Sequence, residues 1–438
     1  MFSALQHSNF RLLWSGQLIS HSGSMMQQAA ILWHVSLLVP PDRRGLALGI
    51  VGLVRVGPIV LFSLWSGVAA DALDRRRLMI VTQMASTLVA STLAVLAFSG
   101  VSVVWPVYLL AALGAAATAF DAPARQALIP NLVPREDLAN ALSLNQIMVQ
   151  SASVLGPSVG GLLIAALGVG WAYLFNAVSF LFVLLALALM RGVPVIDASE
   201  RADASLRAAR EGLRFVFASP IIRATMLLDF FATFFASATA LLPIFAQDVL
   251  HVGARGYGWL YAAPSVGSLV ASGIMVRLVD RIERRGRVLL SAIMVYGLAT
   301  VAFGISTMFW VTFVCLAVTG AADTVSTVLR NVIRQLTTPN RLRGRMTSIN
   351  MVFFMGGPQL GELEAGVVAN WKGAPFAVIT GGIGTLIATV AIAAGVPALR
   401  HYRRADETTF RETHEQLTVE KSGSGVGARD LGETAVNN

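Results

Sequence analysis

The sequence predicts an all-α membrane protein in which twelve transmembrane helices form two pseudo-symmetric bundles of six. Of its 438 residues, 55% are hydrophobic and only 13% are charged, against about 25% charged residues in soluble domains. The apolar residues form repeated runs of about 20 residues, the length at which a helix crosses a bilayer. A set of polar, proline and glycine residues also recurs in the second half of the chain. Together these features favour a helical membrane protein that arose by duplication.

The apolar runs divide the chain into spans and connections. The predicted spans are 11–38, 45–72, 78–99, 103–124, 141–168, 170–190, 223–249, 256–280, 286–307, 309–331, 343–369 and 374–398. We therefore expect a first bundle at 1–190, a linker at 191–220, a second bundle at 221–398 and a disordered tail at 399–438. The linker contains a stretch, 205–217, with the pattern of an amphipathic helix that lies on the membrane surface.

The positions of Lys and Arg predict the orientation of the chain. The short loop with Arg75, Arg76 and Arg77 lies on the face where most basic residues fall. The opposite face carries only Arg43, Arg44, Arg255 and Lys372. Because basic loops stay in the cytoplasm, we expect the Arg75 face and both termini to be cytoplasmic. The net charge of +9 is thereby attributed to topology and not to nucleic acid.

The internal repeat has a fixed spacing over most of its length. In the first half its members are Arg125, Pro134, Ser143, Asn145, Gly156 and Gly161. Their counterparts, each 205 residues later, are Arg330, Pro339, Ser348, Asn350, Gly361 and Gly366. A repeat of this kind predicts two parallel halves of six spans each.

Three motifs resemble the major facilitator superfamily of transporters over residues 9–398. They are Gly67…Asp71…Arg75-Arg76 and the segments 9–16 and 119–141. The two segments are similar to the branch that contains the enterobactin exporter and several macrolide and multidrug effluxers. The resemblance implies a protein of the plasma (inner) membrane that exports a drug, antibiotic or siderophore by proton antiport. It further implies a cavity between the halves lined by the first, fourth, seventh and tenth helices.

The loop motif predicts a gate. Asp71 lies at the end of the second helix, where its charge faces the negative end of the helix dipole. It would be stabilised at the N-terminus of another helix, and the resemblance implies the eleventh, which begins near Arg343. Gly67 lies one turn earlier and lets that helix approach. Asp280 and Arg284 repeat part of this motif in the second half.

A glycine-rich stretch in the fifth helix predicts a bend or a close helix contact. It runs Gly156-Pro157-Ser-Val-Gly160-Gly161 and contains the G-x-S-x-G pattern of hydrolases. That pattern needs a strand-to-helix turn, whereas this one lies inside an apolar run. It resembles the antiporter signature of superfamily exporters, so we assign it a conformational role.

A polar stripe in the first helix predicts a wall of the substrate cavity. Its members are Gln17, His21, Ser24 and Gln28, spaced by four, three and four residues. Hydrogen bonding between packed helices is the alternative explanation. Arg55, Asn145 and Asn350 complete the predicted cavity residues; Arg55 could instead pair with an embedded acid.

Carboxyl groups inside spans are candidates for carrying protons, because a buried charge is expensive without a function. The main candidates are Asp229, Asp323 and Glu362, with Glu364 as a further one. Asp121 is a weaker candidate, since Arg125 lies one turn away and suggests a structural role. A proton carrier must gain and lose its proton as the cavity switches sides.

Several chemistries are excluded by the motifs that the sequence lacks. There is no Gly-Lys-Ser/Thr for a phosphate-binding loop and no H-E-x-x-H for zinc. We therefore expect no enzyme, no metal and no cofactor, but a monomer whose partners are a small molecule, protons and the lipid bilayer. The alternatives are an importer or symporter of a nutrient or lipid-like solute and, more remotely, a transporter-fold sensor or membrane enzyme.

Overall fold

The computed structural model describes residues 3–72, 74–191, 213–237, 239–338 and 342–404. For 63–72 and for several residues near the start of α13 it describes the backbone only. Most of the predicted amphipathic helix and most of the predicted tail lie outside these ranges. The end of the linker, 213–218, is helical, and its Val216 packs on Ile222 and Met346.

The described chain is helical throughout its spans. The first half contains α1 (Ser8–Leu38), α2 (Arg44–Ala72), α3 (Arg75–Phe98), α4 (Trp105–Leu128), α5 (Leu138–Leu167) and α6 (Val169–Leu189). The second contains α8 (Pro220–Phe235), α10 (Gly253–Leu278), α11 (Arg285–Ile305), α12 (Phe309–Thr337), α13 (Arg343–Lys372) and α14 (Ala374–Gly395). These bounds agree with the predicted spans to within a few residues at most ends.

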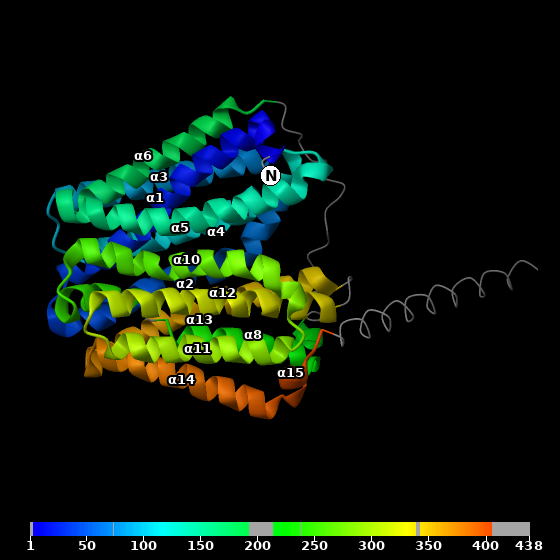
Figure 1. Ribbon diagram of the computed structural model, residues 1–438. Coiled ribbons are helices and arrows are strands. Elements are labelled where there is room, and N and C mark those ends of the chain that lie inside the picture. Colours follow the sequence, from blue (N-terminus) through cyan, green and yellow to red (C-terminus); the bar gives the residue numbers. More distant parts are fainter. Residues whose placement is uncertain (1–2, 73, 192–212, 238, 339–341, 405–438) are drawn as a thin grey trace, which may run out of the picture.

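The six long helices given above for each half form a group, and the two groups lie side by side (Figure 1). Within the first group α1 packs on α5 and α6, and α3 packs on α4 and α6. Within the second, α11 packs on α12 and α14, and α13 packs on α8. The groups touch mainly through α2 with α13 and α5 with α10. We call the end of the molecule with the α1–α2 connection the Arg44 end, and the end with the α2–α3 connection the Arg75 end.

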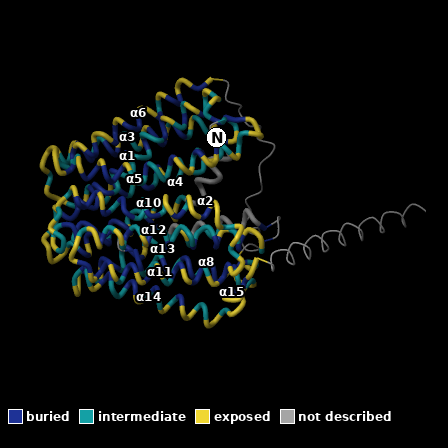
Figure 2. The backbone as a smooth tube through the Cα atoms, in the orientation of Figure 1, coloured by how far each residue is buried: buried dark blue, intermediate teal, exposed yellow. Residues whose placement is uncertain are grey.

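The outer surface of both groups is apolar, as a lipid-facing surface must be. Within the described residues, ten segments are long and apolar enough to cross a membrane. The helices α1 and α13 are as long but are not among these ten, and they pack against several of the others. Exposed residues gather along the outermost helices, among them α6 and α14 (Figure 2). Large apolar side chains such as Phe182, Leu185 and Ile387 are among them. A soluble protein rarely exposes so much contiguous apolar surface.

The two halves repeat each other in backbone detail. Gly168 ends α5 with φ +93°, and Gly373, 205 residues later, ends α13 with φ +91°. Both angles lie in the region that favours glycine. Each glycine turns the chain directly into the last helix of its half. The duplication predicted from the sequence is therefore visible in the fold.

The seventh span departs from its prediction as one helix over 223–249. The helix α8 stops at Phe235 and is followed by the short helices η6 (Thr239–Leu241) and α9 (Leu242–Ile244) and the π-helix η7 (Phe245–Val249). Ser237, within the break, donates a hydrogen bond to the carbonyl of Pro358 at 2.9 Å. Irregular backbone at membrane depth is tolerated where protein or a cavity satisfies its polar groups.

The basic loop at the Arg75 end ties helix ends together. Asp74 caps α3 by accepting hydrogen bonds from the backbone N–H groups of Arg76 and Arg77 at 2.9 and 3.2 Å. Arg75 donates to the carbonyl of Ala127 at 2.8 Å, at the C-terminus of α4. Arg76 likewise donates to Ala188 of α6 at 3.2 Å. Each cation thus meets the unpaired carbonyls at a helix C-terminus.

The corresponding loop of the second half is held by the segment that follows α14. Asp280 and Arg284 are exposed, and the guanidinium of Arg404 donates to the carbonyl of Asp280. The short helix α15 (Pro397–His401) follows α14, and Leu399 and Tyr402 are buried. The folded part of the chain therefore extends beyond residue 398, where the sequence places the start of the tail.

Candidate functional site

Two glycine pairs bring the halves into backbone contact. Gly161 of α5 faces Gly258 of α10, and Gly366 of α13 faces Gly49 of α2. In both pairs a Cβ atom on the glycine of α5 or α13 would lie 2.6 Å from the Cα of its partner. The pairs are related by the internal repeat, with spacings of 205 and 209 residues. Small residues at such crossings let helices approach closely in a membrane.

Polar contacts close the Arg44 end of the molecule. Arg44 of α2 forms an ion pair with Asp248 of η7, with one guanidinium nitrogen 3.0 Å from each carboxylate oxygen. Gln247 donates to the hydroxyl of Ser36 at 2.7 Å. The hydroxyl of Tyr257 donates to the carbonyl of Ala29 at 2.8 Å. Each contact joins one half to the other.

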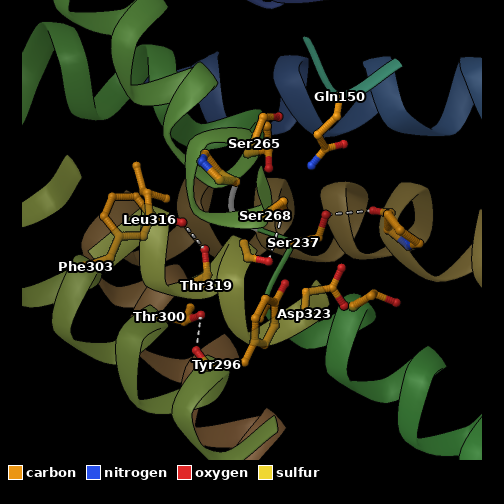
Figure 3. Close-up of a pocket in the computed structure, with 16 residues that line it drawn as sticks. Gln150, Ser237, Ser265, Ser268, Tyr296, Thr300, Phe303, Leu316, Thr319 and Asp323 are labelled. Carbon is orange, nitrogen blue, oxygen red and sulfur yellow. Dashed lines mark hydrogen bonds between the residues drawn. The ribbon is translucent and has the colours of Figure 1, made fainter. Parts of the chain in front are cut away.

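A cavity of about 290 Å³ lies midway along the helices, mainly within the second half. Its wall is rich in hydroxyl groups and contains the break after α8. The lining includes Thr233, Ser237, Thr239, Ser265, Ser268, Tyr296, Thr300, Thr319 and Asp323. Gln150 of α5 reaches toward it from the first half (Figure 3). The cavity therefore lies where the halves face each other.

A charged cluster stands behind this wall. Asp229 of α8 and Arg330 of α12 form an ion pair of 2.9 Å, and both side chains are fully enclosed. Arg334 approaches Asp229 at 3.9 Å and also donates to Asn350. Asp323 lies 3.4 Å from Arg330 and is the exposed member, with 44% of its side-chain surface accessible. The cluster balances two carboxylates against two guanidinium groups, and a carboxylate faces the cavity.

The first half places a related group around Arg125, the counterpart of Arg330. Arg125 lies 3.7 Å from Asp121. Asp121 also accepts hydrogen bonds from Thr82 at 3.1 Å and Gln83 at 2.9 Å. His21 of α1 is close enough to feel the charge of Arg125. In each half, the arginine of the fourth helix is thus near a titratable group of the first helix: His21 here, and Asp229 in the second half.

Glu362 occupies the crossing of α2 and α13. It is buried, and a Cβ atom on Gly52 would lie 2.8 Å from its carboxylate oxygen Oε2. Arg55 lies one turn from Gly52 along α2, within electrostatic range of Glu362. Oε2 has no hydrogen-bond partner among the described residues. Glu362 is thus an enclosed carboxyl group at a contact between the halves.

The structure brings together some of the predicted residues and separates others. Asp323 lies in the cavity wall, and Asn350 belongs to the charged cluster. Gln17 is buried; His21, Ser24, Gln28, Asn145 and Glu364 are half-buried, outside the described cavity wall. Gly67 and Asp71 lie in the last turns of α2, where the contact expected for their side chains falls outside the described residues. Their roles stay predictions.

The fifth-helix glycines do make close contacts. Gly156 packs against the backbone of Ser22 in α1, and Gly160 packs against Met26. Gly161 faces the other half, so one turn of α5 contacts two neighbours. Pro157 contributes a carbonyl that a Cβ on Gly258 would meet at 2.6 Å.

Sequence reasoning missed the arginines and hydroxyls. Arg330 and Arg334 fall near a basic loop and count toward topology, although the structure buries both. Their spacing of four residues in α12, one turn apart, was the available signal. Thr and Ser in an apolar run carry no such signal, because they also bond their own helix.

The fold is that of major facilitator transporters. A bacterial homologue of the human lysosomal transporter Spinster, solved in an inward-facing and unoccupied conformation, superposes with a TM-score of 0.67 at 15% identity, over 92% of this chain and 98% of that one. The chain matches the family model described as transmembrane secretion effector over residues 1–426. It belongs to this family of the major facilitator superfamily and is a multi-pass membrane transporter, not an enzyme.

Two relatives align over most of their lengths. The enterobactin exporter EntS of Escherichia coli (strain K12) is 26% identical over 417 residues, which covers 95% of this chain and 96% of that protein. The multidrug efflux pump Tap of Mycolicibacterium fortuitum is 28% identical over 372 residues, or 83% of this chain and 89% of that protein. The sequence resemblance to this superfamily is thereby confirmed.

Proposed function

We propose that this protein exports a small amphipathic molecule from the cytoplasm by alternating access across the plasma (inner) membrane. The observation that carries the proposal is that polar contacts close the Arg44 end, beyond a cavity that lies where the halves face each other. Basic residues concentrate at the Arg75 end, which supports a cytoplasmic location for that end. In this state a cytoplasmic molecule would enter from the Arg75 end. The similarity to EntS, an enterobactin exporter, and to Tap, a multidrug efflux pump, supports export over import.

Opening toward the outside then requires the contacts of the Arg44 end to separate. The glycine pairs Gly161–Gly258 and Gly49–Gly366 would act as the points about which the halves rock, because their backbones touch without interlocking side chains. Asp71, as the sequence predicts, would join the halves at the other end when the cavity faces out. The two ends would close in turn, as transport from one side to the other requires.

Proton entry is proposed as the driving force, with Glu362 as the carrier. The free energy of a carboxylate depends strongly on whether it is enclosed or hydrated. Glu362 is enclosed beside Arg55, one turn from the Gly49–Gly366 pair, and would be hydrated when rocking about that pair separates α2 from α13 at the level of Glu362. Asp229 is a weaker candidate because Arg330 holds it in an enclosed ion pair.

The test is efflux from an exporter-deficient bacterial strain across a panel of dyes, antibiotics and siderophores, with and without a protonophore. We expect the wild type to lower the accumulation of at least one compound and the protonophore to abolish this effect. Unchanged accumulation of every compound would contradict export, and protonophore-resistant efflux would contradict proton coupling.

Two variants assign the carrier. Glu362→Gln removes the titratable group and keeps the shape, so we expect it to abolish protonophore-sensitive efflux. Glu136→Gln is the matched control, since Glu136 is exposed at the Arg75 end. Normal efflux by Glu362→Gln would exclude Glu362 as the carrier and leave export itself intact.

A further inference from the structure

The hydrogen bonds within the cavity wall determine which ligand groups it can receive. A hydroxyl group has one proton to donate and two lone pairs that accept. Where the proton is already given to a backbone carbonyl, only the lone pairs remain for a ligand. The ligand groups that the wall can bind therefore depend on which of its donors and acceptors are not already used within the protein.

Five of the hydroxyl groups in the wall already donate their proton to a backbone carbonyl. Each of three threonines donates to a backbone carbonyl of its own helix: Thr233 to that of Asp229 at 2.8 Å, Thr300 to that of Tyr296 at 2.9 Å and Thr319 to that of Leu316 at 2.6 Å. Ser237 donates to Pro358 at 2.9 Å and Ser268 to Gly320 at 3.0 Å, each across a helix contact. All five present acceptors to the cavity.

The remaining polar wall carries negative and mixed groups. Asp323 presents a carboxylate that accepts only. Its Oδ1 lies 3.4 Å from Nη2 of Arg330, whose side chain is enclosed and does not line the cavity. Gln150, Thr239, Ser265 and Tyr296 can both donate and accept. Among the described residues that line the cavity there is no lysine, arginine or histidine. An anionic ligand would meet many lone pairs and no cation here.

We propose that this wall is a binding subsite for a protonated amine, with the carboxylate of Asp323 as its ion partner. The N–H groups of an ammonium ion can donate to the Asp323 carboxylate and to hydroxyl acceptors of the same wall, which include Thr300, Thr319 and Ser268. The ring of Tyr296 lies beside Asp323 (Figure 3), where it can contact a cation. The inference rests on the proposed function, because it names the substrate class of the same cavity. It favours organic cations over anionic siderophores.

The test compares three ligands with one body and different head groups. They are 4-phenylbutylamine, its N-acetyl derivative and 4-phenylbutyrate, each titrated by calorimetry into the full-length protein in lipid nanodiscs at neutral pH. Charge-assisted hydrogen bonds are roughly twice as strong as neutral ones, so we expect the amine to bind at least about tenfold more tightly than either analogue, which corresponds to about 1.4 kcal/mol. Equal or tighter binding of the carboxylate would overturn the proposal.

The Asp323→Asn variant should remove the preference for the amine and leave the weak binding of the N-acetyl derivative unchanged. Glu136→Gln, at an exposed site, is the control. If Asp323→Asn does not fold, the wild type supplies a second measurement: the amine should protect Asp323 from modification by a water-soluble carbodiimide, as read by mass spectrometry. Absence of protection would also overturn the proposal.

Equilibrium binding needs no gradient and no direction of transport. If the protein binds the amine preferentially but exports nothing, the result would support the proposed subsite and contradict the proposed function. Export of carboxylates without binding of the amine would retain the function and reject the subsite.

Discussion

Gly161 of α5 and Gly258 of α10 meet so closely that a Cβ atom added to Gly161 would lie 2.6 Å from the Cα of Gly258. Real side chains essentially never sit that close to a backbone atom, so even alanine would push the helices apart. Gly366 and Gly49 stand in the same relation across α13 and α2. The contact between the halves thus requires glycine, which has no Cβ atom, at four related positions.

We expect Gly161→Ala to weaken closure of the Arg44 end. Overpacking costs about 1–3 kcal/mol, which corresponds to roughly a 5- to 150-fold loss of the closed population. Gly366→Ala should act in the same way, because the repeat relates the two sites. Spin labels at the two sides of the Arg44 end, measured by pulsed electron paramagnetic resonance, report the opening.

The matched control is Gly273→Ala in α10. A Cβ atom there meets nothing within 4 Å, and alanine favours a helix by about 1 kcal/mol over glycine. This variant should transport normally and unfold at the same or a higher temperature. If Gly161→Ala behaves like this control, the glycine contact does not govern closure.

The ion pair of Arg44 and Asp248 allows the closed end to be trapped chemically. Cys315 is the single cysteine of the chain, so Cys315→Ser provides a background without reactive thiols. In this background, the double variant Arg44→Cys with Asp248→Cys should be cross-linked by a short bifunctional thiol reagent and should lose transport. If the reagent contains a disulfide, reduction should break the cross-link and restore transport. Either cysteine alone should keep transport after treatment. Full activity of the cross-linked pair would show that this contact need not open.

The buried pair of Asp229 and Arg330 predicts strongly non-additive stability. Loss of one partner from a buried ion pair costs about 3–5 kcal/mol because the other charge is left uncompensated. We expect Asp229→Asn and Arg330→Met each to lower the unfolding temperature sharply, and the double variant to recover part of the loss. Thermal unfolding of the purified variants, followed by tryptophan fluorescence, measures the cycle. Additive losses would mean that the charges do not act as a pair.

The fold could be read from the sequence in more detail than the site. The spans, the halves and the glycine counterparts Gly161 and Gly366 follow from patterns that repeat along the chain. The partners Gly258 and Gly49 could not be identified, because nothing local indicates which helices cross. The same holds for Arg330, whose position near a basic loop suggests a solvated charge although its partner Asp229 comes from a distant helix.

The cavity shows a second limit of sequence reasoning. A polar stripe such as Gln17 and His21 is visible by its helical spacing, whereas Thr300 and Thr319 are isolated in apolar runs. Their role depends on the break after α8, which lines the same cavity, and on the carbonyl to which each hydroxyl donates its proton. Both are properties of the packed structure.

The two aspartates around the α2–α3 connection provide a last prediction, since their roles differ although they are three residues apart. Asp74 accepts two backbone hydrogen bonds as the cap of α3, and asparagine caps nearly as well as aspartate, so Asp74→Asn should retain transport. Asp71→Asn removes the charge that we expect to hold the Arg75 end closed at the N-terminus of α13, and it should cut transport severely without loss of membrane insertion. Efflux rates normalised to the amount of inserted protein compare the two. Normal transport by Asp71→Asn would contradict the predicted gate. An equal loss of transport in both variants would instead indicate that the fold of the loop matters and not the charge of Asp71.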